Sequence, residues 1–334
     1  MKAIVIHQPG SPDVLELQEV NQPQITNPEQ ILVKLKAAGV NPIDTKIRQR
    51  GTFYPEQMPA ILGCDGAGTV QAVGNKVTKF KPGDEVYFCA GGLGKRNTGN
   101  YAEFAVVESH MVAHKPKTLS WAEAAAAPLV LITAWEALGD RAKLQAGQTA
   151  LIQAGAGGVG HVAIQLAKIW GAKVYTTVSS LDKARLVRQL GADEAILYRQ
   201  TNFVEQVKQL TAGKGVDVAF DTVGGETFFQ TVEAVKFYGD LVTILEPDCK
   251  LGSLKTARYR NLRIGLELML TPMLAGLLTA QAYQARILEE CAKLIDTGKL
   301  TIHLSQTYPL SEAAKAHQQI ETGSTTGKLA LIID

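Results

Sequence analysis

Short apolar runs separated by glycine and proline dominate the first third of the chain. Turn signals such as Pro9-Gly10, Asn41-Pro42 and Pro82-Gly83 punctuate these runs. Short runs bounded by such residues are typical of β-strands. The expected strands are Lys2–Ile6, Ile31–Ala37, Gly68–Val73, Asp84–Phe88 and Ala102–Val107. Repeated strands at this spacing predict a barrel-like, partly open β domain.

From Trp121 onward, segments with helical periodicity alternate with short apolar strands. The expected helices are Trp121–Leu138, Gly160–Trp170, Leu181–Leu190 and Phe203–Thr211. The expected strands are Thr149–Gln153, Lys173–Val178, Ala195–Leu197, Val216–Asp221 and Leu241–Leu245. This alternation predicts a parallel sheet with helices on both of its faces.

The last part of the chain adds a strand and then returns to mixed elements. The expected elements are a strand at Asn261–Leu270, a helix at Ala280–Thr297, a strand at Ile302–Leu304, a helix at Ser311–Thr322 and a strand at Lys328–Ile333. We expect the chain to leave the β domain, build the sheet domain and return. Residues 1–124 with 271–334 would form the first domain, and residues 125–270 the second.

Composition narrows the function classes without adding to the fold. The net charge is +2, from 34 Lys plus Arg against 32 Asp plus Glu. Nucleic-acid binding needs a basic face, so this balance argues against it. No apolar run is long enough for a membrane span, and the first residues form a strand rather than a signal peptide. The four cysteines form no CxxC pair, which favours a reduced, cytoplasmic protein.

Residues 154–160 carry the strongest motif, a G-x-G-x-x-G spacing at Gly155, Gly157 and Gly160. The motif follows one expected strand, opens a helix and precedes a second strand, which is the context of dinucleotide binding. We expect Gly155 to permit the tight turn, Gly157 to admit a pyrophosphate and Gly160 to allow close packing of helix and strand. The helix N-terminus would present the N–H groups of Gly158 and Val159 to the phosphates. A glycine-rich turn without a ligand is the alternative.

The residues after the second strand of this unit favour NADPH over NADH. An NAD site needs an acidic residue there for the ribose hydroxyl, whereas this strand ends at Val178 and is followed by Ser179. Lys183 and Tyr198 add an ammonium and a phenol that could surround a 2′-phosphate. In the rival interpretation Asp182 holds the ribose, although a helix start also explains its charge.

Several motifs in order resemble the zinc-independent medium-chain dehydrogenases/reductases, in particular the quinone oxidoreductase and zeta-crystallin group. The resemblance covers essentially the whole chain. Its carriers are residues 38–44 (AGVNPID), 62–68 (LGCDGAG), 80–86 (FKPGDEV), 99–103 (GNYAE), 154–160 and 323–328 (GSTTGK). It implies an α/β fold in which a doubly wound Rossmann sheet, binding NADP, joins a GroES-like, β-rich catalytic domain.

The same resemblance argues against zinc. Zinc-dependent relatives carry cysteine where this chain has Asn41 and histidine where it has Cys64. An asparagine amide is a poor zinc ligand, and the four-cysteine structural lobe is also missing. Cys64 and Asp65 could be a fragment of a metal site, but core packing with a structural carboxylate explains them more simply.

Without zinc, hydride transfer must rely on the cofactor and on hydrogen-bond donors. Quinones and enones suit this chemistry because their developing charge is delocalised. We expect Asn41 to donate its amide to a substrate or nicotinamide carbonyl and Tyr54 to donate a proton, although Tyr54 could simply pack at the pocket mouth. Asp44 and Arg48 are four residues apart, which predicts a helical ion pair.

The resemblance also implies a wider set of contacts and a homodimer, paired through the strand around Ile264–Leu270. Further cofactor contacts are expected from Asn41, Pro42, Thr133, Thr222 and Leu245. The function this predicts is NADPH-dependent reduction of a small quinone or α,β-unsaturated carbonyl. Two alternatives stay open: an enoyl-thioester reductase, which needs a long groove and a firm proton donor, and a non-catalytic NADPH-binding protein.

Overall fold

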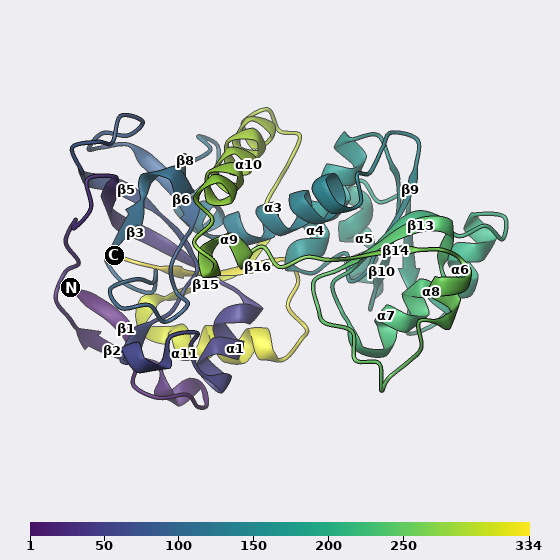
Figure 1. Cartoon of the computed structure of the whole chain (residues 1–334), viewed down its shortest axis with the longest axis horizontal. Coiled ribbons are helices and arrows are strands. Elements are labelled where there is room, and N and C mark those ends of the chain that lie inside the picture. The colour runs from purple at the N-terminus through teal and green to yellow at the C-terminus, as the bar shows by residue number, and fades with distance from the viewer. The chain divides into compact units, whose positions relative to one another are not determined.

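Two structural units divide the chain in the computed structural model, which describes residues 1–334. The first unit contains Met1–Leu129 and Leu270–Asp334, and the second contains Val130–Met269. The chain therefore leaves the first unit once and returns to it, as the alternation of elements predicts. Figure 1 shows the elements of both units.

The second unit is built on a six-stranded sheet with the order β11-β10-β9-β12-β13-β14. Its strands are β9 (Thr149–Ile152), β10 (Lys173–Val178), β11 (Glu194–Leu197), β12 (Val216–Asp221), β13 (Val235–Thr243) and β14 (Arg263–Leu266). Every neighbouring pair runs parallel. The strand order reverses between β9 and β12, so the carboxyl ends of these strands flank the crevice in which such sheets bind ligands.

Helices cover both faces of this sheet (Figure 1). They are α3 (Pro128–Trp135), which begins in the first unit, α4 (Gly158–Ile169), α5 (Leu181–Gln189), α6 (Phe203–Leu210), α7 (Gly225–Val232) and α8 (Lys255–Tyr259). Side chains of α6, α7 and α8 share one buried cluster with the strands, including Phe203, Phe228 and Ala257. The buried strands require this cover because their side chains are apolar on both faces. The predicted doubly wound α/β fold is confirmed.

The first unit combines a seven-stranded and a three-stranded sheet. The larger sheet contains β3 (Gln30–Val40), β5 (Asp65–Val73), β6 (Glu85–Cys89), β7 (Phe104–Glu108), β8 (Val112–His114), β15 (Leu304–Pro309) and β16 (Lys328–Ile332). The smaller sheet contains β1 (Lys2–Ile6), β2 (Glu16–Glu19) and β4 (Ala60–Ile61). The helices are α1 (Pro42–Arg50), α2 (Trp121–Ala126), α9 (Thr271–Leu274), α10 (Leu278–Asp296) and α11 (Ala313–Glu321).

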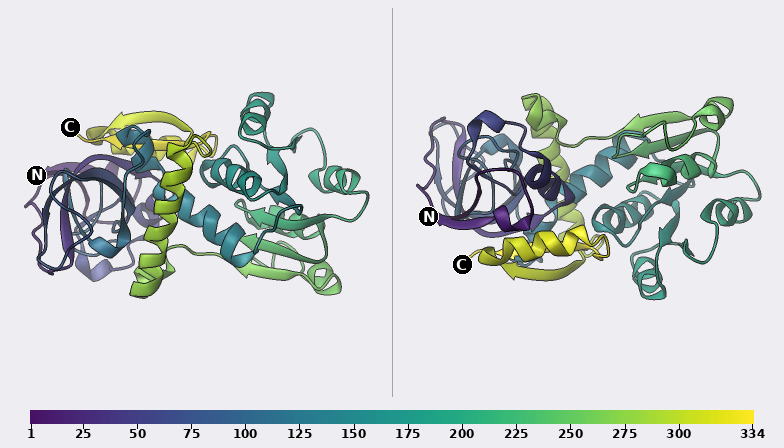
Figure 2. Two further views of the ribbon diagram at one scale, coloured as in Figure 1. Left: turned by 90° about the horizontal axis from the view of Figure 1, so that it is seen from above. Right: turned by 90° about the horizontal axis from the view of Figure 1, so that it is seen from below.

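The two ends of the chain build this first unit together. Strand β16 pairs antiparallel with β3, so Leu329 lies opposite Val40 and Ile332 opposite Ala37. Both views of Figure 2 show the yellow C-terminal segment beside the purple N-terminal strands. Lys328, the first residue of β16, is thereby brought to the start of α1.

Several expected elements differ in extent from the structure, among them the strand expected at Leu241–Leu245, which begins at Val235 and ends at Thr243. The apolar segment Trp121–Leu138 is not one helix, because Pro128 lacks an N–H and disfavours a helical conformation of the residue before it. The strand expected at Asn261–Leu270 ends at Leu266, and Pro272 lies in the first turn of α9. The strand expected at Ile302–Leu304 lies later, at Leu304–Pro309. No helix is both long and apolar enough to cross a membrane.

Candidate active site

The glycine motif forms the turn between β9 and α4 at the carboxyl edge of the parallel sheet. A Cβ on Gly155 would lie 2.0 Å from Oγ1 of Thr176 on β10, and a Cβ on Gly160 would lie 2.3 Å from the Ala154 carbonyl oxygen. Both glycines therefore permit close packing. The left-handed residue of the turn is Ala154, with φ of 51°, so Gly155 permits the tight turn through its missing side chain and not through a left-handed backbone.

The N-terminus of α4 has backbone N–H groups without a hydrogen-bond acceptor in the protein. Gly157 is the N-cap residue and has no side chain to cap the helix. The N–H groups of Gly158 and Val159 make no hydrogen bond within the chain. A Cβ on Gly157 would have only the Ala154 carbonyl oxygen nearby, at 3.1 Å. This arrangement fits a pyrophosphate, which accepts such N–H groups and is attracted to the positive end of a helix dipole.

Beside this turn, the ends of β10 and β11 bring the predicted 2′-phosphate residues together. The Tyr198 N–H donates to the Val178 carbonyl oxygen at 3.2 Å, which places Tyr198 next to Ser179. Ser179 is half-buried and Tyr198 is 48% exposed. Lys183 lies one turn into α5, where burial and then the positive charge of Arg199 lower the pKa of its ammonium. Arg199, which follows Tyr198, is a second cation that we did not predict.

Asp182 does not take the position that an NAD-type ribose acid requires. Its carboxylate pairs with Arg185 at 2.9 Å, and its side chain is 89% exposed. The residue lies in the first turn of α5, where the Ser180 hydroxyl caps the helix by accepting the N–H of Lys183. Its negative charge is explained by the helix dipole.

The remaining expected cofactor residues of this unit follow the neighbouring strands. Thr222 comes after β12, is half-buried and donates its hydroxyl to the Gln153 carbonyl oxygen at 2.9 Å. Leu245 comes after β13, and its N–H donates to Oγ1 of Thr243. Thr133 is a buried residue of α3. Their contacts with a cofactor stay predictions.

In the first unit, Asn41 is held in a buried polar network. Its side chain is 0% exposed. Nδ2 donates to Oδ2 of Asp65 at 2.9 Å, and Oδ1 accepts a hydrogen bond from the Lys328 ammonium. Asp65 in turn accepts the Leu129 N–H at 3.0 Å. The expected donation from Asn41 to a substrate or nicotinamide carbonyl stays a prediction, and Pro42 beside it is exposed.

Burial sets the protonation of this network. It raises the pKa of Asp44 to about 7 and that of Asp65 to about 6, from an ordinary 3.8. The positive charge of Lys328 limits both increases. The same burial lowers the pKa of Lys328, and the surrounding acids oppose this. The positive charge of Lys328 therefore partly offsets the cost of burying the carboxyl groups of Asp44 and Asp65.

Helices α1 and α11 are joined by polar contacts, because Glu321 of α11 accepts hydrogen bonds from both Arg48 and Gln49 of α1. Arg48 bonds to Glu321 at 2.5 Å instead of to Asp44. Asp44 accepts the Asn41 N–H at 2.8 Å and the Tyr101 hydroxyl at 3.2 Å. The hydroxyl of Tyr101 also lies 3.1 Å from Nε2 of His317 on α11. The ion pair predicted between Asp44 and Arg48 is wrong because each side chain has a closer partner from elsewhere in the chain.

Tyr54 differs from Asn41 because it borders an open space. It precedes a short 3₁₀ turn at Pro55–Gln57, is half-buried and lines a cavity of about 790 Å³. Its hydroxyl makes no hydrogen bond within the protein, whereas its N–H donates to Oγ1 of Thr52 at 3.3 Å. The hydroxyl is thus available to a ligand in this cavity.

Comparison with known proteins extends over both units. Residues 27–117 match the alcohol dehydrogenase GroES-like domain model, and residues 190–331 match the zinc-binding dehydrogenase model. A quinone oxidoreductase from Pseudomonas aeruginosa is 36% identical over 324 residues, covering 97% of each chain. The chain belongs to the quinone oxidoreductase group of the medium-chain dehydrogenases/reductases.

Solved structures agree with this assignment. The quinone oxidoreductase from Escherichia coli, solved with NADPH, is 30% identical and superposes with a TM-score of 0.86 over 100% of both chains. An alcohol dehydrogenase superfamily protein from Novosphingobium aromaticivorans is 36% identical, with a TM-score of 0.91 over 100% of both chains. This member of the quinone oxidoreductase group is thus an NAD(P)H-dependent oxidoreductase.

The zinc in the name of the matching domain model does not fit the residues of this chain. The place of a ligand cysteine is taken by Asn41, whose amide is already bonded at both ends. The Lys328 ammonium lies among Asp44, Asp65 and Cys64 and limits the rise in the pKa of the two carboxyl groups, so a second cation there would meet its positive charge. No group of three or more His, Cys, Asp or Glu side chains has the arrangement of a metal site.

Sequence reasoning missed Lys328 and Arg199, for different reasons. Lys328 lies in a segment that carries the family resemblance, but nothing local shows that it reaches Asn41, 287 residues away. Arg199 has a local signal, because it directly follows Tyr198 at a strand end. A search for every cation near the strand ends, rather than in the first helix alone, would have found it.

Proposed function

We propose that this protein reduces quinones and α,β-unsaturated carbonyl compounds with NADPH, without zinc. The observation that carries the proposal is that Asn41, which stands where zinc-dependent relatives have a ligand cysteine, is bonded to Lys328 and Asp65. A site without a Lewis acid suits acceptors whose developing charge is delocalised, and suits saturated alcohols poorly. The similar protein from Pseudomonas aeruginosa is named a quinone oxidoreductase, which supports the same class of acceptor.

NADPH is the proposed form of the cofactor. Lys183 and Arg199 bring two positive charges to the end of β10 and β11, and the nearby acid Asp182 is paired outward with Arg185. Two cations with hydroxyl groups of Ser179 and Tyr198 match a phosphate dianion better than a ribose hydroxyl. When bound, the cofactor supplies the hydride.

The protein's own contribution to the chemistry is a proton and a positioned acceptor. Quinone reduction takes up one hydride and one proton, and the unbonded Tyr54 hydroxyl is the proposed proton donor. Asn41 acts as a positioning residue in this proposal, because its amide ties β3 and α1 to Asp65 and Lys328. Pro42 stays a proposed cofactor contact.

The testing experiment follows NADPH oxidation by absorbance with 1,4-naphthoquinone, an enone and, in reverse, ethanol with NADP⁺. We expect turnover with the first two and little with ethanol, in protein treated with a chelator. Efficient ethanol oxidation that chelation abolishes and zinc restores would overturn the proposal. Little difference in kcat/KM between NADPH and NADH would remove the cofactor preference alone.

A paired variant tests the proton donor. Tyr54→Phe removes only the hydroxyl, and general acid catalysis is typically worth roughly 10²-fold or more in rate. Tyr259→Phe, at an α8 residue that is 76% exposed, is the matched control and should keep full activity. If Tyr54→Phe is as active as the control, solvent supplies the proton.

An enoyl-thioester reductase is the second candidate, favoured by the same cavity. The sequence shows no groove, whereas the structure has a cavity of about 790 Å³ beside Tyr54. That volume lies in the usual range for ligand sites, about 300–1,000 Å³. Crotonyl-CoA as acceptor separates the candidates, because turnover that exceeds turnover with naphthoquinone would favour the thioester.

The proposal also includes the oligomeric state and the cellular location. A homodimer is proposed from the exposed edge strand β14, and its test is given below. A cytoplasmic location is proposed from the cysteine usage, since Cys64, Cys89, Cys249 and Cys291 are all free thiols.

A further inference from the structure

The cavity beside Tyr54 contains a lysine that no group of the protein neutralises. It lies wholly within the first unit and is lined by Tyr54, Leu93, Lys95, Met111 and Met273, among others. Lys95 is exposed, whereas Leu93 and Met111 are buried and give the otherwise mixed lining an apolar part. Lys95 makes no ion pair, and its ammonium makes no hydrogen bond within the chain.

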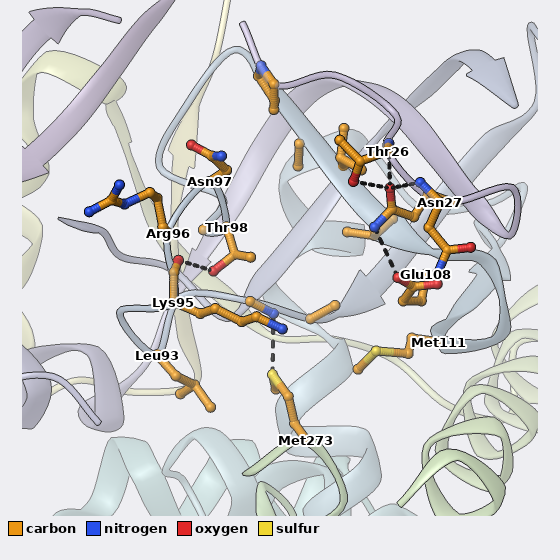
Figure 3. Close-up of a pocket in the computed structure, with 18 of the residues that line it drawn as sticks. Thr26, Asn27, Leu93, Lys95, Arg96, Asn97, Thr98, Glu108, Met111 and Met273 are labelled. Atoms are coloured by element: carbon orange, nitrogen blue, oxygen red, sulfur yellow. Dashed lines mark hydrogen bonds between the residues drawn. The ribbon is translucent and has the colours of Figure 1, made fainter. Parts of the chain in front are cut away.

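The Lys95 side chain extends into this space. Figure 3 shows it reaching from its loop across the cavity toward Met273, whose sulfur accepts the N–H of Gly91 at 3.3 Å. The neighbouring Arg96 points the other way, away from Met273 (Figure 3). The two adjacent cations therefore differ in direction, which offers a matched pair for an experiment.

The acids of the same cavity do not compensate Lys95. Glu108 lies on the opposite wall in Figure 3 and accepts a hydrogen bond from Gln30 at 2.9 Å. Glu29 also lines the cavity and makes no ion pair with Lys95. His110 is bonded to Gln281 at 2.7 Å. An unpaired ammonium over an apolar wall is thus the one positive group directed into this part of the cavity.

Backbone bonds hold the Lys95 loop in a fixed relation to Tyr54. The Phe53 N–H donates to the Leu93 carbonyl oxygen at 3.1 Å, and the Arg96 N–H donates to Oε1 of Gln57 at 2.8 Å. Gly94 has φ of 97°, and a Cβ there would lie 2.2 Å from Cβ of Thr52. The segment that carries Tyr54 and the loop that carries Lys95 are therefore joined by hydrogen bonds.

We infer that this cavity binds acceptors that carry an anionic group, and that the Lys95 ammonium pairs with that group while Tyr54 faces the reacting end. The inference rests on the proposed function and narrows its substrate class. A ligand with a conjugated, apolar body suits the wall formed by Leu93, Met111 and Met273. A sulfonate, carboxylate or phosphate supplies the missing counter-charge, because a lysine ammonium binds such groups as a point charge.

The test compares 1,4-naphthoquinone-2-sulfonate with neutral 1,4-naphthoquinone in the NADPH-loaded protein. Lys95→Met removes the charge and keeps much of the chain length, Lys95→Arg restores the charge, and Arg96→Met is the control. We expect Lys95→Met to raise KM for the sulfonate by roughly 5-fold, the value of one partly exposed ion pair, and to leave the neutral quinone unchanged. Lys95→Arg and Arg96→Met should resemble the wild type.

Two outcomes would overturn the inference. An unchanged KM for the sulfonate in Lys95→Met would show that the ammonium contacts no anion. An equal loss with both quinones would show that Lys95 supports the loop or the reacting oxygen. Repeating the comparison with a carboxylate- and a phosphate-bearing quinone shows which anion is preferred.

A binding measurement separates this inference from the proposed function. Calorimetric titration of NADP⁺-saturated protein with the sulfonate involves no turnover. If the wild type reduces neither quinone but binds the sulfonate about 5-fold more tightly than Lys95→Met does, the proposed function fails and the anion site stands. Equal binding by both proteins overturns the anion site, whatever the activity.

Discussion

Single cationic residues have different surroundings in the two structural units. At the cofactor turn, Lys183 and Arg199 place positive charge where the chain has no acid directed inward. In the first unit, Lys328 is buried at 3% exposure and compensates two buried carboxyl groups. The first two cations lie at the carboxyl edge of the parallel sheet, whereas the third is buried among acids of its own unit. Substitutions should therefore affect cofactor affinity in one place and stability in the other.

Removing Lys183 tests the 2′-phosphate site. A charge-assisted hydrogen bond is worth about 1.5–3 kcal/mol, so Lys183→Ala should raise KM for NADPH by roughly ten-fold or more and barely change KM for NADH. Arg199→Ala should act in the same direction by a smaller factor, because Arg199 is exposed. Arg185→Ala, whose partner is Asp182, is the control. Equal effects on both cofactors would assign Lys183 to the fold.

Asp44 should make stability depend on pH in a definite direction. Its folded pKa of about 7 lies above the ordinary 3.8, so the folded state binds the proton more tightly. Its contribution is therefore fully favourable below about pH 4 and is lost as pH rises toward 7. Each pKa unit corresponds to about 1.4 kcal/mol, which makes the effect on the order of a few kcal/mol.

Urea unfolding of the wild type and Asp44→Asn at several pH values measures this contribution. The neutral amide can still accept the bonds from Asn41 and Tyr101, so the variant should fold. We expect the free energy of unfolding of the wild type, minus that of the variant, to decrease between pH 4 and pH 7. A difference that stays constant, or that increases, would contradict the raised pKa.

At the scale of elements, the β9–α4 turn and the α1–α11 contact show two ways of joining segments. The turn depends on absent side chains, since Gly155 and Gly160 let a strand, a helix and a backbone carbonyl approach closely. The helix pair depends on polar groups, with Arg48 bonded to Glu321 and Tyr101 lying beside His317. The turn can be predicted from glycines that are close in sequence. The helix contact cannot, because its residues are far apart in the sequence.

Two alanine substitutions separate the structural and binding roles of the glycine turn. Gly160→Ala places Cβ 2.3 Å from a backbone oxygen and should destabilise the fold by roughly 1–3 kcal/mol through overpacking. Gly157→Ala meets its nearest atom at 3.1 Å and should cost about 1 kcal/mol or less, yet weaken NADPH binding by about ten-fold. Thermal unfolding and calorimetry measure the two effects. The assignment fails if Gly157→Ala binds NADPH normally.

For the whole molecule, the proposed dimer depends on the sheet edge formed by β14. Strand β14 has a neighbour on one side only, β13, and ends the six-stranded order. Leu266 at its end is 61% exposed and Leu268 just beyond it is 53% exposed. An apolar edge strand tends to aggregate unless it is paired, so pairing with a second copy would protect it.

Light scattering tests the proposed dimer. One chain has a mass of 35.9 kDa, so a dimer should appear near 72 kDa, which is twice that value. Leu266→Lys with Leu268→Lys should shift the mass toward one chain, because two added charges oppose pairing. Leu17→Lys, at an exposed position of β2, is the control. A wild-type mass near 36 kDa at micromolar concentration would refute the dimer.

The amino-acid sequence by itself determined the alternation of elements, the fold class and the glycine turn. These features depend on side chains within one strand, one helix or one short turn, where periodicity and glycine spacing report directly on backbone geometry. Ser179, Lys183 and Tyr198 were found for the same reason, because parallel strands end at one edge of their sheet. The motifs shared with relatives added the two-domain organisation.

Only the tertiary structure decided how the charged residues are paired. Asn41 and Lys328 are 287 residues apart, and Arg48 and Glu321 are 273 apart, so no local pattern links them. The sequence suggested Arg48 as a partner for Asp44 because they share a helix face, but burial brought each a partner from another element. Folding likewise bonded the Asn41 amide to Asp65 and Lys328 and placed Tyr54 and Lys95 along one cavity. Such outcomes depend on desolvation and on which distant segments pack together, and these are properties of the folded chain alone.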